Sequence, residues 1–440
     1  MKLKGWGNYP QLEAVVLSPD TQEDLKRLVQ KGNLIARGNG RAYGDSAVNE
    51  HLTLDMTRFN HILEFNEDTG VVTAEAGVLL ADIIDVFLPR GWFPPVTPGT
   101  KFVTIGGMTA SDVHGKNHHL DGAFSSFIDW IELLDGDGNV KKCSRRQNKE
   151  LFNWTIGGMG LTGIILRIAF RLKRVETGWI EQRIVRTQNL ADTMQVFEDN
   201  DASPYSVAWI DCATRGPKSG RSLVMLGSHA NQSDLSPEQR DDLFPKTRPR
   251  RLKVPFTFPG FVLNKYSVRI FNEAYYRWAG RSTQTQHVKW DGYFYPLDSI
   301  GDWNKIYGRK GFAQFQCAIP MSSAASALAE ILDAVSRSSQ GSFLSVLKRF
   351  GPQDNPFSFP LDGYTLTLDF PINKASLRLM EKLDEITLRH SGRFYLAKDS
   401  RMTADVFHAS DPRIIKFVKA RDKMEATSVF ISAQSERLKF

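Results

Sequence analysis

The sequence predicts an α+β protein made of two parts that differ in glycine content and in the length of their predicted strands. Between residues 37 and 163, glycine-rich stretches alternate with short strands and helices, whereas from about residue 176 glycine becomes sparser and longer strands alternate with helices. The 440 residues suffice for about three domains of ordinary size or for two larger ones. A content of 41% hydrophobic and 24% charged residues is typical of a folded protein and not of a disordered one. No apolar run approaches the roughly 20 residues that a membrane-spanning helix needs.

The first part is expected to alternate short strands with helices. Residues 12–17 predict a strand. Ser18 and Pro19 predict the start of a helix that ends near Gly32, because serine is a favoured N-cap and proline a favoured first helical residue. The turn Asp135-Gly-Asp-Gly138 predicts a hairpin. Further strands are expected over residues 52–56, 70–75, 127–134 and 164–172, and a helix over 79–88.

The second part predicts an antiparallel sheet accompanied by helices. Strands are expected over residues 206–211, 288–295, 312–319, 343–350 and 365–370, and helices over 324–336 and 375–391. Residues 392–401 then predict a strand that ends in charged residues, and two more helical segments follow it.

A glycine-rich loop is the first feature along the chain that suggests a binding site. Gly38, Gly40 and Gly44 expose successive backbone N–H groups, which suit phosphate oxygens, and Arg37 and Arg41 add positive charge. The spacing differs from the dinucleotide-binding G-x-G-x-x-G motif, because the third glycine comes one residue late and no helix pattern follows. Two interpretations stay open, a phosphate-binding loop and an ordinary surface loop.

The stretch from Ile105 to His119 contains two adjacent glycines, several small residues, and then three histidines and a lysine. It follows the turn Pro98-Gly99-Thr100. Glycine and small side chains let a backbone lie flat against a large ligand, and the polar cluster supplies titratable groups at its edge. The alternative interpretation is a glycine-rich loop with solvated histidines.

Charge and cysteine usage limit the partners. The formal net charge of +7 fits an anionic partner, such as a cofactor phosphate, an anionic lipid or nucleic acid. No nucleic-acid-binding module is legible, so no nucleic acid is expected. Cys143, Cys212 and Cys317 are widely spaced, which predicts neither a disulfide framework nor a metal site and favours a reducing cytoplasm. The N-terminus lacks an apolar core, so no secretory signal is expected.

Residues 244–261 combine basic residues with a proline-broken aromatic run. This composition does not suit a core element. It predicts either a surface loop or a contact with an anionic membrane, where lipid charge attracts basic residues and aromatic rings lie at the interface.

Three segments occur in the order and spacing of one family. Residues 37–45, 98–119 and 157–163 resemble the FAD-binding domain of the vanillyl-alcohol oxidase / p-cresol methylhydroxylase class. The resemblance continues through residues 294–298, 369–372 and 395–401, and therefore covers nearly the whole chain. The motifs H-G-K-N-H-H, from His114, and A-K-D-S-R, from Ala397, resemble one branch of this class, whose members oxidise a polyprenyl-phosphate ribose.

The resemblance implies a two-subdomain FAD-binding domain of the p-cresol methylhydroxylase type, formed by residues 1–175 and completed by residues 393–440. An α+β substrate-binding domain would span residues 176–392. FAD would lie with its pyrophosphate over the glycine-rich loop and its flat ring against small residues. The cofactor-binding residues that the resemblance implies are Arg37, Gly38, Asn39, Gly40, Arg41, Ala42, Tyr43, Gly44, Asp45, Ser46, Gly99, Thr104, Ile105, Gly106, Gly107, Ser111, Asp112, His114, Ile165 and Tyr395.

The same loop indicates that FAD is bound non-covalently. Many relatives attach the flavin through a histidine in this loop, but the matching position here is Arg41, and no histidine lies between Arg37 and Asn49. The cofactor is therefore expected to dissociate when the protein is denatured.

Oxidation of a secondary alcohol requires a group that removes the hydroxyl proton and a cation that stabilises the reduced cofactor. The resemblance points to Lys398, as the base or as the charged partner, and to His114, for contact with the ring or as a proton relay. The alternatives are a solvated lysine at the end of a strand and an ordinary hydrogen-bonded histidine.

Substrate contacts are expected on both sides of the site. The substrate-binding residues that the resemblance implies are Lys116, Trp209, Tyr295, Gln314, Gln316 and Lys348. Gln314 and Gln316 are two apart on a predicted strand, so both face one side and suit a polyhydroxyl sugar. Lys348 is a charged residue in an apolar strand, which an anion would explain.

Two positions depart from the pattern of the family. Thr367 stands where relatives that are sensitive to covalent inhibitors carry a cysteine, two residues before Asp369-Phe-Pro. Because a threonine has no thiolate, the chain is expected to escape nitroso-type covalent inhibitors. Thr365 replaces an amide residue of the family, which leaves the fine sugar specificity open.

The resemblance implies FAD-dependent oxidation of a secondary sugar hydroxyl, first of all the 2′-hydroxyl of a polyprenyl-phosphate ribose, to a 2′-keto sugar. That step is the first half of an epimerisation that supplies arabinan precursors for cell walls, with an NAD(P)H-dependent keto-sugar reductase as partner. The alternatives are a free alditol or aldonolactone as substrate, or a non-enzymatic membrane-surface protein. A cytoplasmic protein with peripheral membrane contact is expected, with the periplasmic face as the alternative. The electron acceptor, oxygen or a quinone, stays open.

Overall fold

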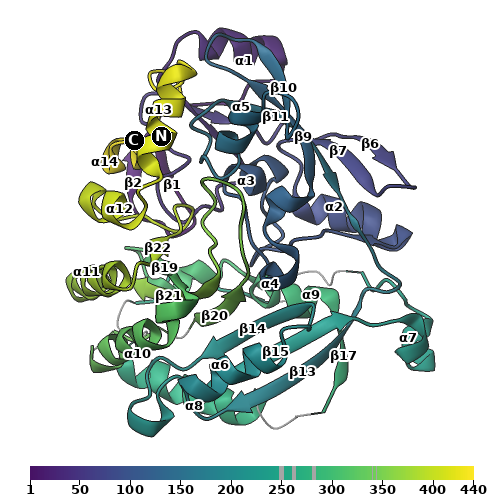
Figure 1. Cartoon of the computed structure of the whole chain (residues 1–440), viewed down its shortest axis with the longest axis vertical. Coiled ribbons are helices and arrows are strands. Elements are labelled where there is room, and N and C mark those ends of the chain that lie inside the picture. The colour runs from purple at the N-terminus through teal and green to yellow at the C-terminus, as the bar shows by residue number, and fades with distance from the viewer. Residues whose placement is uncertain (247–251, 260–263, 280–283, 339, 343) are drawn as a thin grey trace.

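The computed structural model describes residues 1–246, 252–259, 264–279, 284–338, 340–342 and 344–440. Figure 1 shows two sheet systems, one in the upper half, close to both chain termini, and one in the lower half. Antiparallel sheets mixed with helices confirm the predicted α+β fold.

The upper half contains a five-stranded antiparallel sheet with the order β10-β9-β11-β7-β6. Its strands and the helices beside it are β6 (Ile62–Asn66), β7 (Val71–Glu75), β9 (Ile128–Leu134), β10 (Val140–Ser144), β11 (Ile164–Arg171), α2 (Leu80–Phe87), α3 (Ile105–Ala110) and α5 (Lys149–Thr155). Alternate apolar residues of the central strands form one core with α2 and α3. This core fixes α3, the stretch of small residues, against the sheet.

A three-stranded parallel sheet connects the two ends of the chain. It consists of β3 (Val16–Leu17), β5 (Thr53–Asp55) and β4 (Ile35–Arg37), with α1 (Gln22–Val29) beside it. The backbone N–H of Leu34 donates to the carbonyl of Val429 at 2.9 Å, so the C-terminal segment returns to this sheet. That segment forms α12 (Ala404–Ser410), α13 (Ile414–Lys423) and α14 (Ala433–Leu438).

The lower half is an eight-stranded antiparallel sheet with the order β17-β13-β15-β14-β20-β21-β19-β22. Its strands are β13 (Trp179–Thr187), β14 (Tyr205–Ile210), β15 (Ser222–His229), β17 (Gln286–Lys289), β19 (Phe312–Pro320), β20 (Ser345–Phe350), β21 (Gly363–Pro371) and β22 (Arg393–Phe394). Three helices pack on one face, namely α6 (Leu190–Asp199), α10 (Met321–Arg337) and α11 (Lys374–Arg389).

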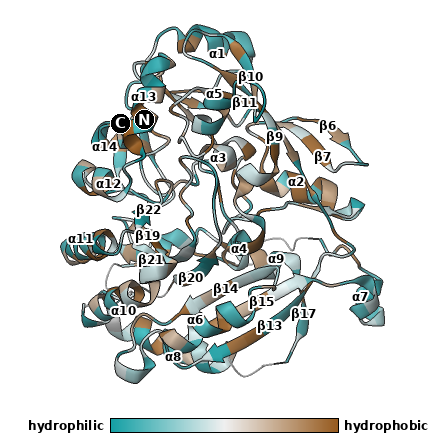
Figure 2. Ribbon diagram, in the orientation of Figure 1, coloured by the Kyte–Doolittle hydropathy of each residue, from teal (hydrophilic) through white to brown (hydrophobic). Residues whose placement is uncertain are grey.

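The two faces of this sheet differ in polarity because side chains alternate along a strand. Phe315, Leu366 and Leu368 lie in the core beneath α10 and α11. Their neighbours Gln314 and Gln316 point to the other face, where the pocket described below lies. Figure 2 shows that α11 is largely hydrophilic on its outer turns, as expected for a helix that covers a core on one side only.

Two predicted elements near the N-terminus differ from those observed. The first helix begins at Gln22 and not at Pro19, because Thr21 accepts from the N–H of Asp24 while Asp24 accepts from the N–H of Thr21, a reciprocal cap. The predicted strand over 12–17 is divided between β2 (Gln11–Glu13) and β3. The glycine stretch after residue 104 forms the helix α3 and not a loop, with Thr104 as its N-cap.

The second part also contains elements that the sequence pattern did not reveal. The strand expected over residues 288–295 ends at Lys289 and continues as α9 (Trp290–Phe294), whose buried Trp290, Tyr293 and Phe294 have helical spacing. Strands β13 and β15 were not anticipated. Only two residues of the expected 392–401 strand pair with the sheet, as β22, and a turn follows them.

The remaining named elements are short, apart from α8. They are β1 (Lys2–Lys4), β8 (Trp92–Phe93), α4 (His118–Asp121), β12 (Lys173–Arg174), α7 (Pro237–Arg240), β16 (Leu252–Lys253), α8 (Lys265–Ala279) and β18 (Ile300–Gly301), besides several 3₁₀ turns. Of the 244–261 segment, residues 247–251 and 260–261 lie outside the described residues. Within the described ranges, no helix has both the length and the apolar character that crossing a membrane requires.

We propose that residues 1–175 and 393–440 form one domain and residues 176–392 the other. The return of the C-terminal segment to the parallel sheet supports this division, as does the eight-stranded sheet, of which all but β22 falls within the middle range.

Candidate active site

A pocket lies between the glycine-rich loop, α3 and the polar face of the eight-stranded sheet. The expected cofactor-binding residues that line it are Arg37, Gly38, Asn39, Gly40, Arg41, Ala42, Tyr43, Ser46, Gly99, Thr104, Gly106, Gly107, Ser111, His114, Ile165 and Tyr395. Lys398, Gln314, Gln316 and Lys348 line the same pocket. The chain therefore brings residues from both sheets and from its C-terminal segment to one place.

The glycine-rich loop is held in position by hydrogen bonds to backbone carbonyls. Arg37 donates to the carbonyls of Lys4 at 2.8 Å and Ala47 at 3.2 Å, and Asn39 donates to that of Phe102 at 2.8 Å. A Cβ at Gly38 would come within 2.2 Å of Oγ1 of Thr104. The loop therefore lies tightly against the start of α3, and only glycine allows this approach.

Helix α3 forms the adjacent wall of the pocket. Oγ1 of Thr104 accepts from the N–H of Gly107 at 3.2 Å and caps the helix. A Cβ at Gly106 would lie 2.7 Å from that of Ala76 on the neighbouring strand end, so glycine is required for this packing. By contrast, a Cβ at Gly99 would meet nothing within 4 Å. The result is a wall of small residues, as a flat ligand needs.

Strand register arranges the sheet side of the pocket. Gln316 pairs with Thr367, which in turn pairs with Val346 on β20. Paired residues of antiparallel strands present their side chains to the same face, and all three line the pocket. In the next rows, Gln314 pairs with Asp369, and its Nε2 donates to Oδ1 of Asp369 at 2.5 Å.

His114 is neutral and presents a hydrogen-bond donor. Nε2 of Gln316 lies 3.2 Å from Oγ1 of Thr365, and that hydroxyl itself donates to the carbonyl of Cys317. Nε2 of Gln316 also lies 3.2 Å from Nε2 of His114, so the histidine nitrogen acts as acceptor and its proton resides on Nδ1. Burial holds the pKa of His114 well below its ordinary value, and the charge of Lys348 lowers it further. Among the described residues, Nδ1 of His114 has no hydrogen-bond partner.

Two lysines supply positive charge with lowered pKa values. Nζ of Lys398 lies 3.8 Å from the ring centre of Tyr43. Burial lowers the pKa of Lys398, the carboxyl of Asp369 opposes that change, and Lys348 adds to it. Burial also lowers the pKa of Lys348, to about 8, and raises that of Asp369. A lysine in such surroundings can lose its proton near neutral pH, which a free lysine cannot do.

Three of the expected substrate-binding residues do not line the pocket. Trp209 packs against Tyr275 of α8, with ring centres 5.0 Å apart. Tyr295 lies in a buried aromatic cluster, 6.1 Å from Trp290. Nζ of Lys116 donates to the carbonyl of Tyr293 and lies 4.1 Å from that ring centre. Each side chain is held by its own neighbours and does not line the cavity. Burial and the charge of Lys348 lower the pKa of Lys116 to about 7.

Four of the expected cofactor-binding residues also lie behind the pocket wall. Asp112 accepts hydrogen bonds from Ser125 and Gln353 and from the hydroxyl of Ser358, and burial raises its pKa to about 6. Asp45 accepts from Arg437 at 2.7 Å. Ile105 is part of the core, and a Cβ at Gly44 would lie 2.1 Å from the carbonyl of Asp399. These residues support the wall without lining it.

Some pocket residues were not singled out from the sequence. Trp6 lies 4.3 Å from the Arg41 guanidinium, and Leu344 and Val346 come from β20 and the residues just before it. Asp369 does not line the pocket, but it holds the pocket residue Gln314. The alternation of side chains along β21 could have shown that Asp369 lies on the same face as Thr367. For Trp6, nothing in the N-terminal sequence pattern points to a site.

Comparisons with known proteins agree with this geometry. Residues 13–144 match the family model of the FAD binding domain. The chain is 36% identical to decaprenylphosphoryl-β-D-ribose oxidase of Mycolicibacterium smegmatis, over 99% of this chain and 97% of the relative. The chain belongs to the decaprenylphosphoryl-β-D-ribose oxidase family. More distant members of the flavoenzyme class match only in part. L-gulonolactone oxidase of Mus musculus is 27% identical over 38% of each chain, and cytokinin dehydrogenase 2 of Arabidopsis thaliana is 27% identical over 34% of this chain and 32% of the relative.

Membership of this family confirms FAD as the cofactor and the chain as an FAD-dependent oxidoreductase. The pocket fits FAD on its own chemistry. The wall of α3 is glycine-rich and closely packed, two arginines lie along the loop, and the buried Nδ1 donor of His114 lacks a partner among the described residues. A ligand with a flat ring, a buried acceptor and a diphosphate satisfies all three features.

Proposed function

We propose that this pocket oxidises the 2′-hydroxyl of a polyprenyl-phosphate ribose to a 2′-keto sugar. The observation that carries the proposal is the convergence of Lys398, Lys348, His114 and two glutamines on the same pocket as the glycine wall. The name of the family member that matches along its whole length supports a phosphorylated ribose carrying a polyprenyl chain.

The glycine-rich loop and α3 would hold FAD, which, when bound, supplies an acceptor for the hydride that leaves the alcohol carbon. Lys398 would remove the hydroxyl proton, since its lowered pKa allows it to be a free amine at neutral pH. Lys348 would remain the cation that attracts the substrate phosphate. Nδ1 of His114 would donate a hydrogen bond to the ligand.

Gln314 and Gln316 would bind the sugar hydroxyls. Gln314 already donates to Asp369 and Gln316 to Thr365 and His114, so their carbonyl oxygens are the atoms available as acceptors. Amide acceptors at fixed positions along one strand favour a sugar whose hydroxyls match their spacing. We do not assign substrate contacts to Trp209, Tyr295 or Lys116, because none of them lines the pocket.

The proposal extends to the surroundings of the enzyme. The 2′-keto product would be reduced by a partner NAD(P)H-dependent keto-sugar reductase, which completes an epimerisation that supplies arabinan precursors for a cell wall. A polyprenyl substrate resides in a membrane, so the protein would work in peripheral contact with one, on the cytoplasmic or the periplasmic face.

The test is anaerobic mixing of the FAD-loaded protein with candidate substrates while the flavin absorbance is followed. Polyprenylphosphoryl ribose is expected to bleach the flavin, whereas ribose 5-phosphate, an alditol and an aldonolactone are expected to react poorly. Faster bleaching by a free alditol or aldonolactone would overturn the proposed substrate class. No bleaching by any sugar would overturn the oxidation itself.

A further inference from the structure

Helix α8 carries an unusual number of exposed apolar side chains. Ile270, Trp278 and Tyr266 are 72%, 70% and 68% exposed, and Phe271 is 47% exposed. Single exposed apolar residues are normal on a protein surface, but several on one helix face mark a site of interaction. At 100° per residue, Tyr266, Ile270, Ala274 and Trp278 follow one another along a single face. We call this the outward face of α8.

The side of α8 that faces the sheet carries polar groups as well as apolar ones. Its inward stripe contains Asn272, whose Nδ2 donates to Asp211 at 2.8 Å, and Tyr276, whose hydroxyl donates to the carbonyl of Thr187 at 2.8 Å. Glu273, at the border of this stripe, accepts from Arg221 at 2.6 Å. The helix is thus attached to the sheet by these polar groups and by apolar contacts of Val268 and Tyr275, and it presents further apolar groups to the outside.

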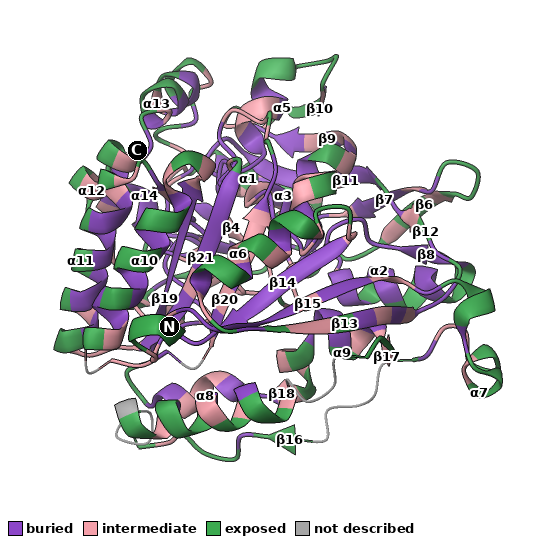
Figure 3. Cartoon of the chain, turned by 60° about the horizontal axis from the view of Figure 1, so that its bottom comes forward, coloured by how far each residue is buried: buried purple, intermediate pink, exposed green. Residues whose placement is uncertain are grey.

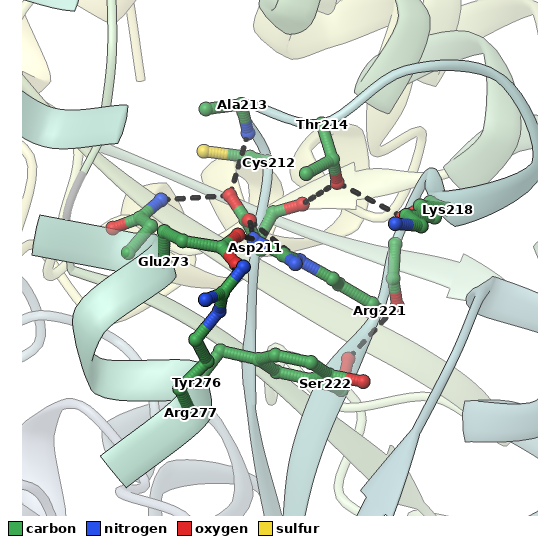
Figure 4. A network of polar contacts seen from close by, with 12 residues as sticks. Asp211, Cys212, Ala213, Thr214, Lys218, Arg221, Ser222, Glu273, Tyr276 and Arg277 are labelled. Atoms are coloured by element: carbon green, nitrogen blue, oxygen red, sulfur yellow. Dashed lines mark hydrogen bonds and ion pairs between the residues drawn. The ribbon is translucent and has the colours of Figure 1, made fainter. Parts of the chain in front are cut away.

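The attachment fixes the rotation of the helix. Figure 4 shows the Arg221 guanidinium between Asp211 of the sheet and Glu273 of α8, with the ring of Tyr276 close by. The side chains of Arg221 and Asp211 are 7% and 1% exposed, so separating them would leave buried charges unpaired, which is strongly destabilising. The helix cannot turn its outward face inward without breaking this network. Figure 3 shows α8 at the periphery of the molecule, with exposed turns along its outer side.

The outward face lies beside the pocket. The row of paired residues that crosses the sheet runs from Thr367 and Val346, which line the pocket, to Trp209 on β14. Trp209 lies under Tyr275, so α8 covers the same face of the sheet, immediately next to the pocket. At the other end of the helix, Val268 contacts Gly341, three residues before the pocket residue Leu344.

The positive charges on α8 favour an anionic partner for its outward face. The helix contains Arg269 and Arg277, and its one acidic residue, Glu273, is already paired with Arg221 and Arg277. A face with tryptophan and isoleucine bordered by arginines complements a lipid interface with anionic headgroups, where the apolar groups enter the acyl boundary and the arginines meet phosphates.

We propose that the outward face of α8 docks on an anionic lipid surface and so holds the pocket next to a membrane-embedded substrate. The second half of this statement rests on the proposed function, whereas the docking itself does not. In the docked protein, Ile270 and Trp278 leave water, and the adjoining pocket faces the bilayer.

The experiment is flotation of the FAD-loaded full-length protein with phosphatidylcholine vesicles, with and without phosphatidylglycerol. The test variants are Ile270→Ser and Trp278→Ser. The matched control is Ile415→Ser on α13, since Ile415 is also exposed, at 59%, but lies on another helix. We expect the wild-type protein to bind the anionic vesicles, and each test variant to bind at least about tenfold more weakly, since each substitution removes a large apolar side chain that leaves water on docking. The control is expected to bind like wild type.

Other results overturn the proposal. Wild-type protein that does not float, or equal binding by all four proteins, contradicts docking through α8. A wild-type dimer that becomes a monomer in Ile270→Ser, without vesicle binding by either, assigns the face to a second copy of the chain. Bleaching of the flavin by the candidate sugars in detergent tests the proposed function separately, so loss of flotation with normal bleaching refutes docking alone.

Discussion

Nε2 of Gln316 lies 3.2 Å from Nε2 of His114 and thereby determines which histidine nitrogen carries the proton. The amide has a second acceptor in Thr365, at 3.2 Å, so both of its hydrogens are used and the imidazole accepts. Gln316 is on this account a positioning residue. It acts on the ligand through the Nδ1 donor of His114.

A change of Gln316 to glutamate reverses this arrangement. The carboxylate accepts from Nε2 of His114 and raises the pKa of the imidazole, because a nearby negative charge favours its protonated form. We expect the rate of flavin reduction by the sugar to fall by about 10²-fold, the lower end of the range for general acid–base groups. The variant should also gain a dependence in which the rate falls as the pH rises through the raised pKa, because loss of that proton leaves Nδ1 without the hydrogen that it donates to the ligand. Thr365→Val keeps the contact between Gln316 and His114 and should show no new pH dependence; an identical pH profile in Gln316→Glu and wild type would refute the positioning role.

Replacement of Lys398 tests the proposed base. Lys398→Met should lower the rate of flavin reduction by about 10²–10⁴-fold, with FAD still bound. In the wild-type protein the free amine is the active form, so the rate should rise with pH and level off below the pH at which a free lysine deprotonates, since burial lowers this pKa. Lys398→Arg keeps the charge but not the base, and should be nearly as slow as the methionine variant. If the arginine variant keeps the wild-type rate, Lys398 is an electrostatic partner and not the base.

Acid precipitation tests how FAD is held. Because Arg41 occupies the position of the histidine that carries flavin in many relatives, the yellow colour should leave with the supernatant when the protein is precipitated. Mass spectrometry of the chain should give the mass of the polypeptide alone. Colour retained in the pellet would show a covalent link elsewhere in the chain.

Thr367 determines the response to electrophiles. It lines the pocket between Gln316 and Val346, so a cysteine there would be accessible to a nitrosoarene, whereas threonine has no thiol. Intact mass should show no adduct in wild type and one adduct in Thr367→Cys. Cys317 is the internal control, because it faces the core and burial raises its pKa to about 12. An adduct on wild type that disappears in Cys317→Ser would contradict this prediction.

Arg437 joins two parts of the pocket wall that are distant in sequence. It donates to Asp45, behind the glycine-rich loop, at 2.7 Å and to Asp399, next to Lys398, at 2.8 Å. Arg437→Met leaves two buried carboxylates without their partner, and the free energy of unfolding should fall by about 3 kcal/mol in urea titrations at neutral pH. A surface pair gives the comparison: Arg389→Met, which removes one partner of the exposed Glu330, should change the free energy of unfolding far less than Arg437→Met does.

The difference in the free energy of unfolding between wild type and Arg437→Met should depend on pH. Burial alone would raise the pKa of Asp399, but the charge of Arg437, together with the backbone N–H groups of Arg401 and Met402 and the charge of Arg401, outweighs burial and holds this pKa below its ordinary value. The stabilisation is therefore complete above the unfolded-state pKa of an aspartate and is lost as the pH falls through the lower, folded-state pKa. The difference between wild type and Arg437→Met should shrink in acid. A difference that grows as the pH falls would contradict this assignment.

The fold class and the wall of the pocket could be predicted from sequence because they depend on local patterns. Alternation along β19 placed Gln314 and Gln316 on one face, and small residues marked α3. The pairing of Trp209 with α8 could not be predicted, because the same alternation places Trp209 on the pocket face, and only the tertiary position of a helix decides what covers it. Likewise, Lys116 precedes a helix of four residues and turns toward Tyr293, a contact across 177 positions of sequence.

The measurement that tests the central claim most directly is anaerobic flavin reduction by polyprenylphosphoryl ribose labelled with deuterium. If the pocket removes hydride from the 2′ carbon, deuterium at that carbon should slow the bleaching of the flavin, whereas deuterium at the 3′ carbon should leave it unchanged. A slowing caused by the 3′ label, or bleaching that neither label affects although substrate binding is saturated and chemistry limits the rate, would contradict oxidation at the 2′-hydroxyl.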